Sequence, residues 1–139
     1  MILVDTNVIA EPLRREPSAA VIAWLDAQNA ETLFLAAISL AEIRFSVAAL
    51  PEGRRRDQLH QSIEQRVLPL FRGRILPFDD AASKAYASLR ARARAAGTAI
   101  APSDGFIAAT AESSGLIVAT RDVTPFEAMG VRVIDPWAC

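Results

Sequence analysis

Residues 1–7 read MILVDTN. Residues 2–4 form a short, continuous apolar run, which is typical of a strand buried on both faces in a parallel sheet. Three polar residues, Asp5, Thr6 and Asn7, follow it directly. Parallel α/β sheets bind their ligands beyond the carboxyl ends of the strands. The opening of the chain therefore predicts a sheet and also the edge at which its chemistry takes place.

The same alternation of apolar runs and helical spacing continues along the chain. Strands are expected at residues 33–36, 116–119 and 131–134, with a short extended piece at residues 74–78. Helices are expected at residues 7–13, from Ser18 onward, at 39–49, at 54–67, from Asp79 or Asp80 to Gly97, and from Pro102 to Gly115. Short strands separated by helices indicate an α/β fold with a parallel sheet. Without a repeat or a low-complexity linker, residues 1–139 are expected to form one domain.

The composition is that of a globular protein, with 52% hydrophobic and 22% charged residues among 139. The single cysteine, Cys139, excludes an internal disulfide and a thiolate metal site. Any Ser-His-Asp triad would have to use the only histidine, His60, which lies in a polar stretch. The opening segment is too short for a signal peptide, and no apolar run approaches the roughly 18 residues of a membrane span. We therefore expect a cytoplasmic protein that contacts no membrane.

The basic residues are almost all arginine. The formal net charge is −1, so overall charge gives no attraction to nucleic acid. Lys84 is the only lysine, and arginines cluster at residues 54–56, 72–74 and 90–94. Because guanidinium groups make paired contacts to phosphate, each cluster has two interpretations, a phosphate-binding surface or a solvated one. Trp24 and Trp137 could likewise stack on bases, although Trp24 shares a helical stripe with apolar neighbours.

Four acidic residues are expected at the same edge of the sheet. Asp5 follows the first strand, and Asp122 lies just beyond the strand at residues 116–119. Asp104 lies in the first turn of the helix that begins at Pro102. Glu42 is expected in the first turn of the helix that follows the second strand. Because the carboxyl ends of parallel strands meet at one edge, this topology predicts a single crevice that collects all four carboxylates.

Carboxylates gathered in one crevice repel each other and raise the pKa of one member. A divalent cation between them would keep them ionised, and Mg²⁺ and Mn²⁺ prefer oxygen ligands of this kind. A metal-bound water loses its proton more easily, and the metal can orient a phosphate. An acidic site without a cysteine or histidine cluster therefore favours phosphate-ester hydrolysis over acyl transfer.

Each of these acids also has a purely structural interpretation. Asp5 could cap the helix that follows it. Ser39 and Glu42 fit the S-x-x-E capping box. Asp104 fits the preference for acids in a first helical turn, and Asp122 could be a turn residue. Taken singly, none identifies a site, so the prediction depends on their joint placement.

Four segments together resemble the PIN-domain family. They read MILVDTNV at residues 1–8, ISLAEIRFSV at 38–47, APSDGFIAATA at 101–111 and GLIVATRDVTPFE at 115–127. More closely, they resemble the toxin ribonucleases of VapBC-type toxin–antitoxin pairs, in the FitB-like branch. The resemblance covers nearly the whole chain and ends with the VIDPW segment.

The resemblance implies a three-layer α/β/α fold with a central, mainly parallel sheet. It also implies an endoribonuclease that depends on Mg²⁺ or Mn²⁺ and hydrolyses RNA with a metal-activated water. Asp5 and Asp104 would contact the metal, while Glu42 and Asp122 would bind a second ion or position the water. The polar positions that would orient these carboxylates are Thr6, Asn7 and Thr120. The family further implies a homodimer and a cognate antitoxin whose tail occupies the cleft.

One segment departs from the family pattern. Many close relatives read T-R-N-x-x-D-F at the last motif, whereas here the acid is Asp122 and Pro125 precedes Phe126. Residues 124–127 fit a capping box with proline at the first helical position. The acid is thus moved rather than lost, which leaves the role of Asp122 open.

Two other functions are compatible with the sequence. The first is a non-catalytic binding module that keeps the fold, against which the complete acid set argues. The second is a metal-dependent phosphohydrolase acting on small phosphoesters. Haloacid-type enzymes of that kind use an Asp-x-Asp pair, and the residue two positions after Asp5 is Asn7, which disfavours a phospho-aspartate route.

Overall fold

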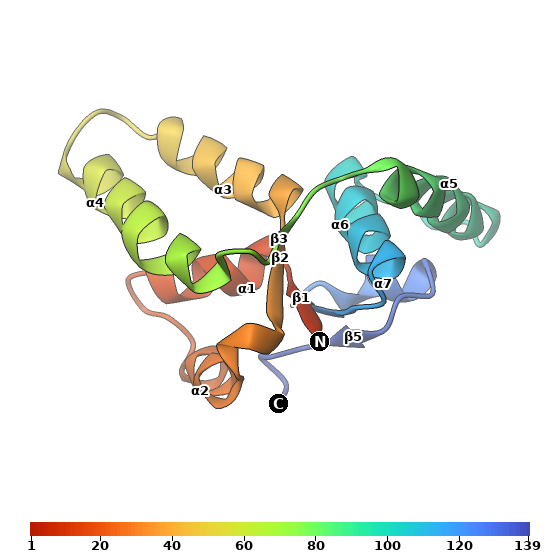
Figure 1. The fold of residues 1–139 in the computed structure, drawn as a ribbon, viewed down its shortest axis with the longest axis horizontal. Helices are drawn as coiled ribbons and strands as arrows, with labels where there is room; N and C mark the ends of the chain where they lie inside the picture. Colours follow the sequence, from red (N-terminus) through yellow and green to blue (C-terminus); the bar gives the residue numbers. More distant parts are fainter.

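The computed structural model describes residues 1–139 and is built on a five-stranded, fully parallel sheet (Figure 1). Its strands are β1 (Ile2–Val4), β2 (Leu33–Ala36), β3 (Ile75–Leu76), β4 (Ile117–Ala119) and β5 (Val133–Ile134). They lie in the order β3-β2-β1-β4-β5, so the first strand of the chain is central. The predicted parallel sheet between helical layers is confirmed, because the apolar runs are buried on both faces.

The register of the sheet aligns the ends of its central strands. Val4 of β1 is paired with Leu35 of β2 and with Ala119 of β4. The residues that follow, Asp5 and Thr120, are therefore neighbours at the carboxyl edge. The backbone N–H of Asp5 donates to the carbonyl of Ala119 at 2.9 Å, which extends the ladder to the start of the site.

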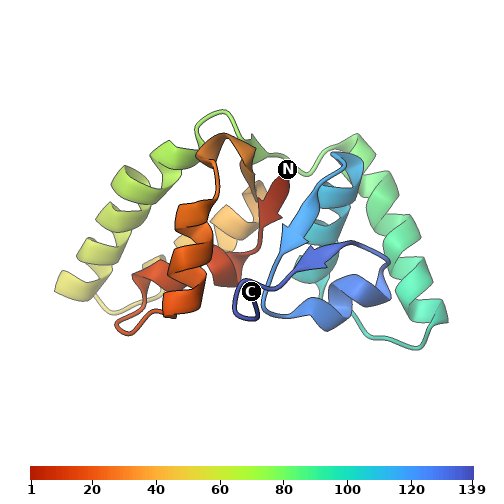
Figure 2. The same cartoon turned by 90° about the horizontal axis from the view of Figure 1, so that it is seen from below.

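Seven α-helices surround the sheet. They are α1 (Thr6–Ala10), α2 (Ala19–Ala27), α3 (Ala37–Ala48), α4 (Arg54–Ser62), α5 (Asp80–Ala95), α6 (Pro102–Ser113) and α7 (Val123–Ala128). Figure 2 shows the elements from α1 to α4 on one side of the sheet and those from α5 to α7 on the other. No helix is both long enough and apolar enough to cross a lipid bilayer.

Alternate side chains of the strands build a separate core on each face of the sheet. Leu3 and Val118 face α5, α6 and α7 and join a cluster of 14 buried residues. Val4 and Leu35 face the helices α1 to α3 and join a cluster of 12. Leu3 and Leu35 are fully buried, and truncation of such a leucine to alanine costs about 2–5 kcal/mol. The two cores fix the sheet edge that carries the site.

Helix α3 begins two residues earlier than the sequence predicts. It starts at Ala37, directly after β2, and its N-cap Ala36 makes no side-chain hydrogen bond. Ser39 consequently lies inside the helix and is buried, so the predicted capping box with Glu42 is wrong. Glu42 lies in the middle of α3 rather than in its first turn. Packing of the strand-to-helix junction, and not a local cap, determines where this helix starts.

Three further boundaries differ from the predictions. Helix α1 ends at Ala10, and residues 11–13 form a 3-10 turn instead of continuing it. Helix α4 ends at Ser62 and passes through a wider helical turn at residues 63–67 into a 3-10 turn at residues 68–71. Helix α7 begins at Val123, so the capping box predicted for residues 124–127 is also wrong. The predicted cap of α5 is confirmed, because Asp79 accepts from the N–H of Ala82 at 2.9 Å.

Candidate active site

Asp5 is the most constrained carboxylate of the sheet edge. Only 4% of the residue is exposed, and its side chain caps α1 by accepting from the N–H of Thr6 at 2.7 Å. The other carboxylate oxygen, Oδ2, accepts from the hydroxyl of Thr120 at 2.8 Å and from Nδ2 of Asn7 at 3.4 Å. The capping interpretation of Asp5 is therefore correct, and it coexists with a place in the site.

A short polar network joins the end of β1 to the segment after β4. Asn7 donates from Nδ2 to the hydroxyl oxygen of Thr120 at 3.3 Å, and Asn7 Oδ1 accepts from the N–H of Arg121 at 3.3 Å. The same hydroxyl of Thr120 accepts from the N–H of Asp122 at 3.1 Å. Thr120 is fully buried, so these bonds hold the loop that carries Asp122 against the site.

The other three carboxylates approach Asp5 from three different elements. Glu42 of α3 is half-buried, and its Oε1 accepts from the hydroxyl of Thr6 at 3.1 Å. Asp104 is half-buried in the first turn of α6, as predicted. Asp122 is the exposed N-cap residue of α7, but its side chain makes no capping hydrogen bond. None of these three side chains is thus committed to capping its own helix.

The charges of the four carboxylates act on one another. Burial is the main cause that raises the pKa of Asp5; the hydrogen bonds from Thr120 and Thr6 lower it, and the charges of Glu42 and Asp122 raise it. Burial also raises the pKa of Asp104, and the charges of Asp5 and Asp122 add to the effect. The structure therefore brings Asp5, Glu42, Asp104 and Asp122 into one electrostatic neighbourhood, although they come from four segments of the chain.

The donor set suits a hydrated hard cation. It consists of carboxylate and hydroxyl oxygens only, which favours Mg²⁺ or Mn²⁺ over zinc. No three histidine, cysteine, aspartate or glutamate side chains lie close enough together to bind one ion directly. Mg²⁺ is usually held by one or two carboxylates and keeps several waters, so this wider spacing fits it. Asp5 and Asp104 are the residues whose raised pKa a cation would relieve.

Sequence reasoning missed one buried acid that lies outside this group. Glu11 is only 3% exposed, and its Oε1 accepts from Nη1 of Arg14 at 3.0 Å and from the N–H of Ser18 at 3.1 Å. It fastens the connection between α1 and α2. A glutamate in a polar stretch beside prolines carries no sequence signal of burial. His60 is exposed on α4, as expected, and takes no part in the site.

Comparison with known protein families identifies the class of proteins that has this fold and this group of acids. The model of the PIN domain matches residues 2–131. The chain therefore belongs to the PIN-domain family, which confirms the resemblance seen in the sequence.

Relatives of nearly the same length narrow the class further. Plasmid stability protein StbB of Pseudomonas syringae pv. tomato is 54% identical over 137 residues, 99% of each chain. VapC ribonuclease Y4jK of Sinorhizobium fredii is 53% identical over 137 residues, covering 99% of this chain and 98% of the relative. Toxin FitB of Neisseria gonorrhoeae is 51% identical over 137 residues, again 99% of each. Within the family, these relatives place the chain among the VapC-type toxin nucleases.

Solved structures agree with this placement. A chain in the crystal structure of FitAcB from Neisseria gonorrhoeae superposes with a TM-score of 0.96 at 50% identity, covering 100% of both chains. The structure of FitAB bound to an IR36 DNA fragment gives a TM-score of 0.95 at 50% identity, covering 99% of this chain and 96% of the other.

Proposed function

We propose that the chain is a Mg²⁺- or Mn²⁺-dependent endoribonuclease, the toxin component of a toxin–antitoxin pair. The observation that carries the proposal is the gathering of acids at the carboxyl edge of the sheet, where Thr6 bonds to Asp5 and Glu42, Thr120 bonds to Asp5 and to the N–H of Asp122, and Asp104 lies in the first turn of α6. Phosphodiester hydrolysis needs a cation at such a place, because RNA and carboxylates are both negatively charged. The relative named as a VapC ribonuclease supports RNA as the substrate.

Each carboxylate has a role that follows from its surroundings. When bound, the divalent cation would supply an activated water and orient the phosphate. Asp5 and Asp104 would hold it, and Asp5 is fixed for this role by Thr120 and Thr6. Glu42, oriented by the hydroxyl of Thr6, and Asp122 would position the attacking water or a second ion. Asn7 and Thr120 keep the loop of Asp122 in place.

The test is cleavage of RNA with Mg²⁺ or Mn²⁺ by the wild type, Asp5→Ala and Asp104→Ala. Each variant should lose at least about a hundredfold in rate, the usual cost of removing an essential catalytic group. Asp80→Ala is the matched control, because Asp80 is an exposed acid on α5 whose only ion pair is with Lys84. Undiminished cleavage by both site variants would refute the assignment.

Two further measurements separate this function from its alternatives. Calorimetric titration should show Mg²⁺ or Mn²⁺ binding to the wild type and weaker binding to Asp104→Ala. No binding at all would favour a non-catalytic module. A generic phosphomonoester should not be turned over, and rapid turnover would favour a small-phosphoester hydrolase.

We also propose that residues 1–139 act as one domain in the cytoplasm, as a homodimer with a cognate antitoxin. The solved FitAcB and FitAB assemblies support a protein partner. Apolar surface is available for it, because Phe45 is 72% and Leu70 57% exposed. Leu70 borders an apolar cavity of about 280 Å³ together with Ile22, Leu25 and Val67. Leu70→Glu should weaken copurification with the antitoxin, and light scattering gives the number of subunits.

A further inference from the structure

Two arginines beside the carboxylates are each held on an aromatic ring. Cζ of Arg90 on α5 lies 5.5 Å from the centroid of the Tyr86 ring, and its Nη1 donates to the Tyr86 hydroxyl at 2.7 Å. Cζ of Arg121 lies 5.2 Å from the centroid of the Trp137 ring. Contact with a ring restricts the position of a guanidinium, and its N–H groups that do not bond to the ring residue remain able to donate to a phosphate.

Both arginines adjoin members of the acidic site. Arg121 directly precedes Asp122, and its N–H donates to Asn7 in the polar network of Asp5. The side chain of Arg90 lies against Gly105, the residue after Asp104, where an added Cβ would stand 3.3 Å from Arg90 Cδ. The absence of a side chain at Gly105 is what allows Arg90 to come this close to the first turn of α6.

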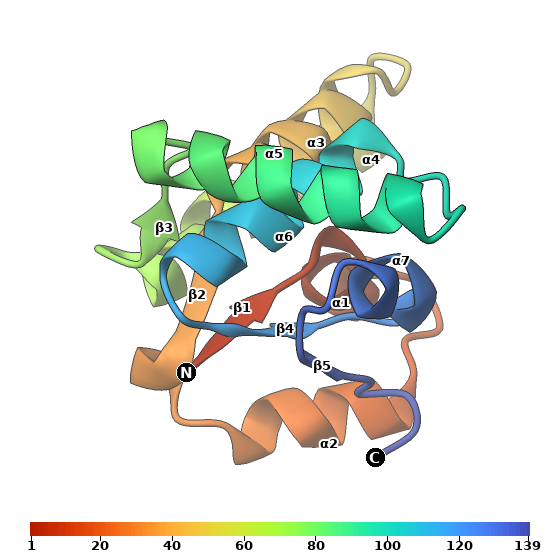
Figure 3. The ribbon, with the colours of Figure 1, turned by 90° about the vertical axis from the view of Figure 1, so that its right-hand side faces the viewer.

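The two arginines reach the site from opposite faces of the sheet. Tyr86 packs against the core that α5, α6 and α7 form on one face. Trp137 packs against the core formed with α1, α2 and α3 on the other. Figure 3 shows the C-terminal end of α5 at the same end of the sheet as α1 and α7, where β1 and β4 finish. Arg90 and Arg121 therefore approach the end of the sheet that carries the acids from its two opposite faces.

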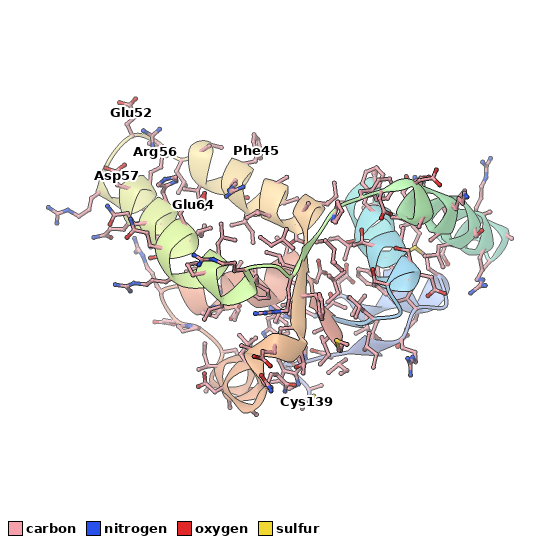
Figure 4. The ribbon with its side chains drawn as sticks, viewed as in Figure 1. Phe45, Glu52, Arg56, Asp57, Glu64 and Cys139 are labelled. Carbon is pink, nitrogen blue, oxygen red and sulfur yellow. The ribbon has the colours of Figure 1, made fainter.

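Neither guanidinium is neutralised by an acid. The ion pairs of the chain use Arg14, Arg44, Arg56 and Lys84 as cations. The arginine cluster at residues 54–56 differs in this respect, because Arg56 lies 3.9 Å from Glu52, and Figure 4 shows both at the outer end of α4. Arg90 instead borders an open cavity of about 610 Å³ together with Arg94 and Thr98.

We propose that Arg90 and Arg121 bind the RNA phosphates on either side of the one that is cleaved. This inference rests on the proposed function and adds to it the path of the RNA. The RNA would cross the carboxyl edge of the sheet from the α5 side to the Trp137 side. Four carboxylates repel an RNA strand, and two fixed, unpaired cations beside them offset that repulsion. Tyr86 and Trp137 act as positioning residues in this proposal, because each contacts one of the two guanidinium groups.

The experiment measures the salt dependence of binding of a short, fluorescein-labelled single-stranded RNA by anisotropy. All proteins carry Asp5→Asn, which prevents cleavage during the titration. At moderate salt, Arg90→Ala and Arg121→Ala should each weaken binding about tenfold, the loss of one charge-assisted hydrogen bond. Each should also reduce the slope of log K against log salt by about 0.7, the value for one phosphate contact on a single strand.

Arg92→Ala is the matched control. Arg92 lies on the same helix as Arg90, but its Nη1 donates to the carbonyl of Met129 at 3.3 Å, on the side of α7. Its removal should leave both affinity and slope unchanged. Arg90→Lys should keep the slope but bind more weakly than the parent, because a lysine retains the charge and loses the paired geometry. Tyr86→Phe, which removes only the hydrogen bond to Arg90, should give a smaller loss than Arg90→Ala.

Equal slopes for Arg90→Ala, Arg121→Ala and Arg92→Ala would overturn the proposal. It would also be overturned if the Arg90 and Arg121 variants changed the subunit number or antitoxin binding and left RNA binding intact. Circular dichroism identifies any misfolded alanine variant, in which case Arg90→Gln and Arg121→Gln replace it. Failure of the nuclease assignment gives a different result. It appears as undiminished RNA cleavage by Asp5→Ala, and it does not change how the arginine substitutions alter the salt dependence of RNA binding.

Discussion

The hydroxyl of Thr120 donates a 2.8 Å hydrogen bond to Oδ2 of Asp5, across 115 positions of sequence. This bond joins the ends of the two central strands and lowers the pKa of Asp5 against the opposing effect of burial. It favours the ionised form of a carboxylate whose pKa burial raises overall, and the ionised form is the one that binds a cation.

Thr120→Val should therefore reduce cleavage without unfolding the protein. The isosteric side chain removes the donor to Asp5 and the acceptor for Asn7 and Asp122, so we expect a ten- to hundredfold loss of kcat/KM, typical of residues that orient metal ligands. Thr110→Val is the control, because Thr110 is similarly buried but its hydroxyl bonds only to the carbonyl of Phe106, away from the site. Equal activity of the two variants would remove Thr120 from the site.

The raised pKa values of Asp5 and Asp104 predict a pH dependence of the metal-free protein. Between the ordinary value of 3.8 and the raised value, the folded state binds more protons than the unfolded state. The free energy of unfolding should therefore fall as pH rises through this window and recover as pH falls back through it. Urea denaturation in EDTA across a pH series measures the effect, and Asp104→Asn should reduce its slope.

Metal binding should show the opposite pH dependence in the same window. A cation competes with protons for Asp5 and Asp104, so affinity for Mn²⁺ should increase as pH rises. Calorimetry at several pH values tests this expectation and should also detect release of protons on binding. An affinity that does not change with pH would mean that neither carboxylate is a ligand.

Glu11→Ala should destabilise the fold and leave the chemistry intact. The change removes the partner of Arg14 and leaves the Ser18 N–H without its acceptor, at a cost of about 1–3 kcal/mol. Cleavage per folded molecule should not change, because Glu11 lies outside the acidic site. Glu16→Ala, at an exposed neighbouring position, should have almost no effect on the urea midpoint.

Ser39→Ala should stabilise the protein. The Ser39 hydroxyl is fully buried in α3 and has no hydrogen-bond partner, so its removal should increase the free energy of unfolding by about 1 kcal/mol. Ser46→Ala on the same helix is the comparison, because that hydroxyl is exposed and bonds to the carbonyl of Glu42 at 2.9 Å. A destabilised Ser39→Ala protein would contradict this account.

The sheet could be predicted because its strands are short, continuous apolar runs, a pattern that few other structures share. Residues 2–4 and 33–36 are apolar runs with polar or helical segments on each side, and both match the observed strands residue for residue. The start of α3 was not predictable in this way. Ser39 and Glu42 satisfy a local capping rule, but the chain enters the helix from Ala36 because β2 ends there.

The site was predictable only as far as strand ends determine it. Asp5 and Thr120 follow β1 and β4, and parallel pairing brings them together. The bond from Thr6 to Glu42 depends instead on how α1 packs against α3, which no local pattern specifies. Similarly, the sequence shows where arginines cluster but not which side chains they contact. Only the fold shows that Arg90 contacts the ring of Tyr86, whereas Arg56 lies beside Glu52.

The central position of β1 also bears on how the protein is made. Asp5 is synthesised early, at the end of β1. Thr120 and Asp122, which orient and complete its site, are synthesised only after β4, the second neighbour of β1 in the sheet. Such long-range pairing is slow to form, and partial chains that end before β4 hold no complete set of carboxylates.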